Sequence, residues 1–396
     1  MLPAAGLTLG DGPRTDPTAV RAGARVRWAP RASVGLWADP MPELGADGPG
    51  LPTPEMGAAW RVGSVRLTAS HDGQRLEPGA SGGVVLHDRV RQGRLEVATA
   101  EPVRLPWLLR HLGPFMISAS GSVMPSDTLP NVGFFTGEFR LQPFPWLTLG
   151  LYRTAAVVNE TDGETLGLRD LWLILKGTRS GSTANFDDQK ASMSASVRAR
   201  LLGVTVNPYF VWGWEDTWKI DEDPGTVLGV WLPAVPLGGQ PVGLRYEYTA
   251  FGDDARIIWP WSERWAWREW YGRVLRGRNV YAEGDELLGH PLGGYGTEHR
   301  VELDLAFADP GLVVSGLLFT RDRVQGFAED YRLGEPRTIE YRNLLYDEMP
   351  GRSLGASLHG TLTTGGVRLD GGLTVETGRE GWDRVTGSVG ATWLLP

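Results

Sequence analysis

The feature that most constrains this chain is an alternation of apolar and polar side chains that recurs in many separate runs. In the last run Val385, Val389 and Trp393 share one face, while Arg384 and Thr386 fall on the other. A period of two residues is typical of a β-strand with one apolar face. The runs are roughly 8 to 13 residues long, which exceeds the usual soluble strand and suits a tilted strand that crosses a bilayer.

The connections between these runs alternate between long and short from about residue 114 until the last hairpin. Outer-membrane barrels have short periplasmic turns and long extracellular loops, whereas a soluble β-sandwich has no reason to alternate so regularly. We therefore expect strands near 114–123, 133–142, 146–156, 188–201, 204–214, 226–234, 241–250, 297–307, 312–322, 353–363, 367–377 and 382–395.

The first hundred residues are less regular. We expect their strands near 24–38, 57–70, 83–90 and 93–99. Residues 1–23 read as an irregular lead-in, and residues 24–396 as one all-β, antiparallel transmembrane barrel of about 16 to 18 strands. Short helices are expected within the connections at 105–112 and 168–175.

Composition excludes other classes of protein. The chain has no cysteine, which removes disulfides, thiolate metal sites and cysteine nucleophiles, and its net charge of -8 argues against a general nucleic-acid binder. The longest uncharged run, residues 225–244, contains three prolines, so it predicts two strands and a turn rather than a spanning helix. The first residues lack an export signal, so we expect a processed form or a different start.

A tryptophan-rich stretch within the connection of about 251–296 is the most unusual segment. Five tryptophans fall within twelve residues and are interleaved with arginines. Indole rings stack on the apolar faces of sugars, and arginine bonds hydroxyls or carboxylates. The alternative is that these rings pack as the core of the loop or lie in an aromatic belt. The predicted polysaccharide-binding residues are Arg256, Trp259, Trp261, Arg264, Trp265, Trp267 and Arg268.

Charged residues of both signs occupy the face that the alternation predicts to point inward. This mixture suits a polar lumen, either as a structural network of ion pairs or as the lining of a conduit. The inward set is Arg61, Arg66, Glu138, Arg140, Arg198, Arg200, Arg245, Glu247, Glu302, Asp304, Arg368 and Asp370.

No sequence pattern indicates catalysis. The chain has no HExxH, no GxSxG and no phosphate-binding loop, so no catalytic residue, metal ligand or cofactor is predicted. Asp253, Asp254 and Glu263 leave open a pair of glycosidase carboxylates, which makes an outer-membrane hydrolase an alternative reading.

Short motifs in a particular order add a resemblance to a known family. They are Leu112-Gly113-Pro114-Phe115, Pro130-Asn131, Phe139-Arg140-Leu141-Gln142-Pro143, the run at 145–155 that ends in Arg153-Thr154-Ala155, Asp170-Leu171-Trp172, Tyr246-Glu247-Tyr248-Thr249 and Leu288-Gly289-His290. Over roughly 80–305 the chain resembles the capsule assembly Wzi family.

The resemblance implies an 18-stranded outer-membrane barrel that acts as a surface lectin and helps attach capsular polysaccharide. Family members also carry a periplasmic helical bundle, for which residues 1–56 here are too short and too rich in proline and glycine. We expect a monomer in the cell outer membrane, with surface polysaccharide and membrane lipid as its partners. A passive porin-like channel is the alternative.

Overall fold

The computed structural model describes the chain in separate ranges. The ranges are 4–9, 20–31, 34–39, 43–45, 48–50, 55–80, 82–86, 91–124, 132–159, 185–215, 225–238, 240–251, 274–275, 278–279, 282–283, 286–290, 292–293, 296–307, 311–323, 326–330, 337–341, 351–364, 367–379, 381 and 383–393.

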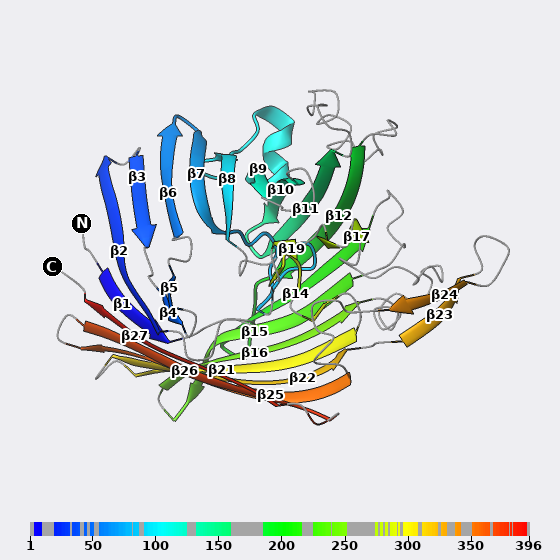
Figure 1. The fold of residues 1–396 in the computed structure, drawn as a ribbon. Coiled ribbons are helices and arrows are strands. Elements are labelled where there is room, and N and C mark those ends of the chain that lie inside the picture. Colours follow the sequence, from blue (N-terminus) through cyan, green and yellow to red (C-terminus); the bar gives the residue numbers. More distant parts are fainter. Residues whose placement is uncertain are drawn as a thin grey trace.

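One antiparallel sheet of 21 strands forms the wall of the molecule (Figure 1). β13 (Ala199–Leu201) continues β12 alongside β14, and β4 (Glu43–Gly45) with β5 (Gly48–Gly50) forms a hairpin beside β2, so eighteen wall strands remain. In order around the wall they are β1 (Ala4–Leu9), β2 (Val20–Arg31), β3 (Val34–Asp39), β6 (Glu55–Val62), β7 (Val65–Gly73), β8 (Arg91–Thr99), β9 (Phe115–Met124), β10 (Val132–Phe144), β11 (Leu147–Asn159), β12 (Asn185–Val197), β14 (Val204–Glu215), β15 (Gly225–Leu237), β16 (Gln240–Phe251), β21 (Gly296–Phe307), β22 (Leu312–Arg323), β25 (Gly351–Thr364), β26 (Val367–Gly378) and β27 (Asp383–Trp393).

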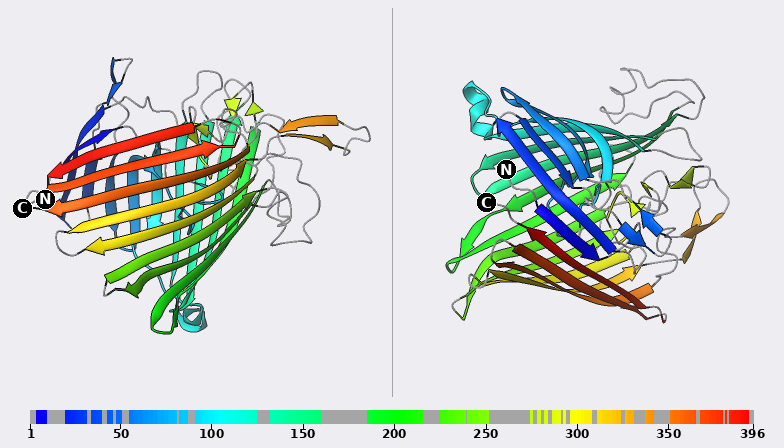
Figure 2. Two further views of the ribbon diagram at one scale, coloured as in Figure 1. Left: turned by 90° about the horizontal axis from the view of Figure 1, so that it is seen from below. Right: turned by 60° about the vertical axis from the view of Figure 1, so that its left-hand side comes forward.

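The two ends of this sheet meet. β1 lies alongside β27 (Figures 1 and 2). In lipid an unpaired strand edge is costly because no water satisfies its backbone groups, and a sheet that curves back on itself brings its two edge strands together. The all-β antiparallel barrel predicted from the alternation is confirmed.

The short turns gather at one end of the barrel, as predicted, and the long connections at the other. The connection of β8 to β9 is the long one at the short-turn end, and it contains the 3-10 helix η1 (Trp107–Leu112) that the sequence placed at 105–112. The helix predicted at 168–175 lies outside the described residues. At the long-loop end, small hairpins pair β17 (Val274–Leu275) with β18 (Arg278–Asn279), β19 (Ala282–Glu283) with β20 (Glu286–Leu287), and β23 (Gly326–Asp330) with β24 (Arg337–Tyr341). Within the described part of the chain, no helix is long and apolar enough to cross a membrane.

Two expectations for the first hundred residues are corrected. The described part of residues 1–23 consists of β1 and the start of β2, which pair with each other. The sequence pattern did not predict β1 because its small residues give little contrast between apolar and polar positions. Of the expected strand at 83–90, residues 83–86 are described, and they belong to no strand. They lie in the interior, because Val84, Val85 and Leu86 are apolar in succession and all are buried.

The wall has two chemically distinct faces. Its inward face carries polar pairs such as Arg66 with Glu96 at 2.8 Å and Ser122 with Gln92 at 3.0 Å. Its outward face carries large apolar side chains, which is the arrangement that a lipid environment requires. They include Leu95, Val123, Leu151, Leu318, Leu354, Leu358, Leu373 and Val385, all exposed at the protein surface.

A charge placed on the outward face tests this assignment. Leu318 lies near the middle of β22 and is 60% exposed. Leu318→Arg should lower the free energy of unfolding by about 2–4 kcal/mol relative to Leu318→Ala, because an arginine near the midplane loses its hydration. Urea unfolding in lipid vesicles measures the difference. Equal stability of the two variants would show that Leu318 does not face lipid.

Candidate functional site

The connection between β7 and β8 folds into the barrel. We call its described residues, 74–80 and 82–86, the inward loop. Its apolar side chains, Leu76, Val84, Val85 and Leu86, are at most 3% exposed. An apolar loop in an otherwise polar lumen needs apolar partners, and a group of wall residues supplies them.

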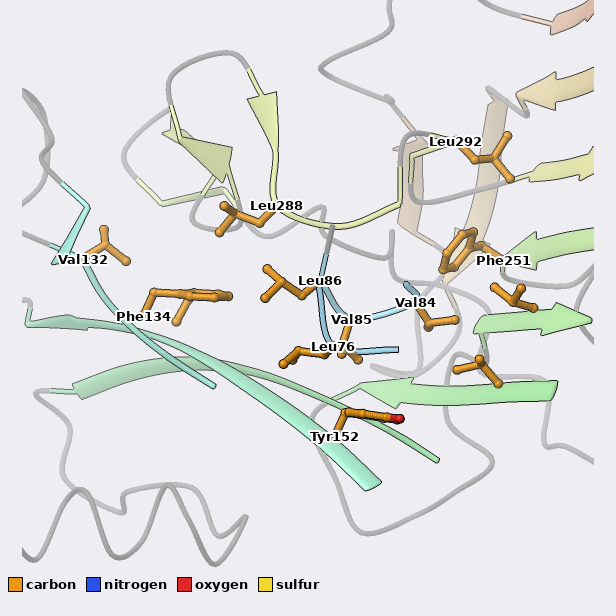
Figure 3. Close-up of a cluster of buried hydrophobic side chains, with 13 residues drawn as sticks. Leu76, Val84, Val85, Leu86, Val132, Phe134, Tyr152, Phe251, Leu288 and Leu292 are labelled. Carbon is orange, nitrogen blue, oxygen red and sulfur yellow. The ribbon is translucent and has the colours of Figure 1, made fainter. Parts of the chain in front are cut away.

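These partners form one hydrophobic cluster with the inward loop (Figure 3). Phe134 and Tyr152 approach it from one part of the wall and Phe251 from another. Burying each leucine or valine contributes about 1.5–3 kcal/mol, so the loop is held firmly. The remaining members of the cluster are Val132, Ala156, Val211, Val227, Leu288 and Leu292.

Hydrogen bonds extend the attachment across the lumen. Near β7, Ser120 and Thr136 donate to the Gln74 side-chain oxygen at 3.1 and 3.2 Å. Farther along, the backbone N–H of Ala80 donates to Glu247 Oε2 of β16 at 2.6 Å. Seven wall strands (β8, β9, β10, β11, β12, β14 and β15) separate β7 from β16, so the loop bridges almost opposite sides of the barrel.

Glu77 ties the two limbs of the loop together. Its Oε2 accepts the backbone N–H of Val85 at 2.9 Å, and its Oε1 accepts the hydroxyl of Ser192 on β12. A Cβ at position 83 would collide with this carboxylate, so Gly83 is required by close approach. Burial raises the pKa of Glu77 to about 7, although the hydrogen bonds from Ser192 and the backbone oppose the rise.

A second segment, residues 286–290 and 292–293, enters the lumen from the connection of β16 to β21. Leu288 and Leu292 join the same cluster as the inward loop. The backbone N–H of Leu292 donates to Nδ1 of the buried His290 at 3.1 Å, and the His290 ring lies 5.6 Å from that of Phe251. This lumenal segment contains the Gly-His motif that the sequence resemblance used.

Several of the predicted lumenal charges form ion pairs along the wall. Arg245 pairs with Glu302 at 3.5 Å, and Arg368 with Asp370 at 3.0 Å. Glu376, which the sequence reading omitted, accepts from Arg321 at 3.1 Å and from Arg323 at 3.3 Å. These contacts support the structural-network interpretation of the inward charges. Among the residues that the structure describes, no cluster of three or more His, Asp or Glu could hold a metal.

The predicted polysaccharide-binding residues, from Arg256 to Arg268, all lie outside the described residues, so that site stays a prediction. Sequence reasoning missed the inward loop. Its signal was present in the turn-forming residues 78–83, followed by three consecutive apolar residues that no lipid-facing strand with a polar inner face would carry.

The raised pKa of Glu77 predicts a pH-dependent loop. Because the protonated form is favoured in the folded state, its contribution is complete below the ordinary pKa of 4.5 and is lost as pH rises through about 7. Amide exchange of residues 82–86, corrected for intrinsic rates, should therefore be more protected at pH 6 than at pH 8. Glu77→Gln should remove this difference, while Glu101→Gln, at an exposed ion pair with Arg61, should keep it. An unchanged pH response in Glu77→Gln would exclude Glu77 as its source.

Solved structures share this fold. The chain is similar to OccD3 (OpdP) of Pseudomonas aeruginosa at 10% identity, covering 100% of this chain and 91% of that chain with a TM-score of 0.54. It is similar to the outer membrane protein OpdK of the same organism at 11% identity, with coverages of 100% and 97% and a TM-score of 0.54. At such identities the likeness establishes the outer-membrane barrel fold alone.

Sequence comparison identifies the family. No curated protein matches the chain. The family model for the capsule assembly protein Wzi matches residues 58–265, which is more than half of the chain. Together with the barrel fold, this match places the protein in the cell outer membrane. The chain belongs to the capsule assembly protein Wzi family.

Proposed function

We propose that this protein holds capsular or other surface polysaccharide by non-covalent contacts of its long loops and does not act as a passive channel. The observation that carries the proposal is the bridged lumen. An 18-stranded barrel is wide enough for an aqueous channel unless loops occupy it. Here the inward loop and the segment of residues 286–290 and 292–293 pack together inside it.

The cluster in the lumen also supports a role for the connection that carries the tryptophan-rich stretch. Phe251 precedes that stretch, Leu288 and Leu292 follow it, and all three are fully buried in the same cluster. Both ends of the connection are thus fixed at the long-loop end of the barrel. Anchored ends reduce the conformational entropy that a loop loses when it binds a ligand.

Removing the indole rings tests polysaccharide binding. The combined change Trp259→Ala, Trp261→Ala and Trp265→Ala should release most cell-surface polysaccharide into the medium, because the sugars lose their stacking surfaces. The measurement is cell-bound against shed glycan. Trp107→Ala is the matched control, since Trp107 is 88% exposed on η1 at the short-turn end. Retention like that of the control, with the barrel still folded by its gel shift on boiling, would remove these residues from the proposal.

Conductance in planar bilayers tests the bridged lumen. The native protein should be nearly silent. The double change Leu76→Asp and Val85→Asp should raise conductance severalfold, because buried charges would expel the inward loop. Ser357→Asp, on the inward face of β25, adds a lumenal charge without touching the loop and should stay silent. High conductance in the native protein would favour the porin-like alternative.

A further inference from the structure

A cavity of about 750 Å³ lies in the barrel between the inward loop and the short-turn end. Arg75 and Gly79 of the inward loop line it. Other lining residues lie near the short turns, including Trp146 between β10 and β11 and Arg198 between β12 and β13. The cavity therefore lies on the periplasmic side of the loop, apart from the long loops. Its volume falls in the range of about 300–1,000 Å³ found for small-molecule sites.

The charged side chains that line this cavity in the described part of the chain are all positive. Three arginines (Arg75, Arg198 and Arg245) line it, and no carboxylate does so among the described residues. Arg245 has only a 3.5 Å contact with Glu302, and its Nε is buried without a hydrogen-bond partner within the described ranges. Neither Arg75 nor Arg198 has an ion pair in that part of the chain. Two cations without a matching carboxylate, grouped with a third whose only carboxylate contact is long, favour an anionic ligand.

Aromatic rings lie beside these arginines. Trp146 is 50% exposed and Trp231 37% exposed, so parts of both indoles are open. The Arg245 guanidinium lies 5.1 Å from the centre of the Trp231 ring, a stacking contact that fixes both side chains. The Tyr209 hydroxyl donates to Glu247 at 2.5 Å, and its ring occupies the space where Gly229 lacks a Cβ. The site is therefore built before any ligand arrives.

The remaining polar lining residues complete a recognisable set. Gln142, Thr148 and Asn207 offer amides and a hydroxyl, which bond sugar hydroxyls in either direction. A small dicarboxylate would use the arginines but leave the indoles and amides without contacts. A neutral sugar would use the indoles but leave Arg75 and Arg198 without an ion pair. A ligand with a pyranose ring and a carboxylate uses all three kinds of group.

We propose that this cavity, the lumenal pocket, is a second glycan site that binds a hexuronic acid residue from the periplasmic side. The carboxylate lies among the three arginines, and the apolar face of the sugar ring lies on the exposed indole surface. The lumenal pocket does not depend on the surface loops of the proposed function, since its lining residues belong to the inward loop, the short turns and the wall strands.

Calorimetric titration of the detergent-solubilised full chain tests the proposal with three probes: a glucuronic acid disaccharide, glucose and succinate. The acidic sugar should bind at least tenfold more tightly than either of the others. The double variant Arg75→Gln and Arg198→Gln should weaken its binding at least tenfold. Arg368→Gln is the matched control, because Arg368 also faces the lumen but lies on β26 beside Asp370.

Each outcome bears on the proposal separately from the surface site. If succinate bound as tightly as the acidic disaccharide, the claim that the site recognises a sugar ring would be overturned. If glucose bound as tightly, the claim that the site requires a carboxylate would be overturned. Loss of binding in Arg368→Gln as large as that in the double variant would overturn the location. The variant with Trp259, Trp261 and Trp265 changed to Ala should still bind the acidic disaccharide. The variant with Arg75 and Arg198 changed to Gln should still retain polysaccharide at the cell surface. Each proposal can therefore fail while the other stands.

Discussion

The need to satisfy every backbone hydrogen bond in lipid is the constraint on which this structure depends. A long antiparallel sheet whose first and last strands lie side by side reflects this constraint, and the alternation of side chains follows, with apolar residues outside and polar residues inside. A barrel of this size leaves a wide interior, which must either hold water or be occupied by the chain itself. The second solution is the one found here.

The inward loop resolves a conflict between the two environments. A polar lumen does not hold an apolar loop by itself, so the wall departs from its polar pattern at Phe134, Val211 and Phe251. Polar contacts of the loop then reach the strands on either side of this cluster, through Gln74 at one end and Ala80 at the other. One loop thus divides the interior into a bridged region and the lumenal pocket, which lies toward the short turns.

Two kinds of contact in the lumen have different roles. Ion pairs such as Arg321 with Glu376 join neighbouring parts of the wall, and their charges are matched. Arg75 and Arg198 in the lumenal pocket are not matched, although the same face of the barrel supplies acidic residues elsewhere. Matched pairs stabilise a polar wall, whereas grouped unmatched cations beside open indoles are suited to a ligand. This difference separates structural from candidate binding residues.

The sequence by itself determined the wall, because a period of two residues and the alternation of connection lengths are local features. β14 was expected near 204–214 and spans Val204–Glu215. The sequence alone did not determine β1, whose alanines and glycine give too little contrast between apolar and polar positions. Nor did it determine the inward loop, whose burial depends on Phe134 and Phe251 from distant strands. Only the tertiary structure brought Arg75, Arg198 and Arg245 together, because they lie on separate elements that become neighbours when the barrel closes around the loop.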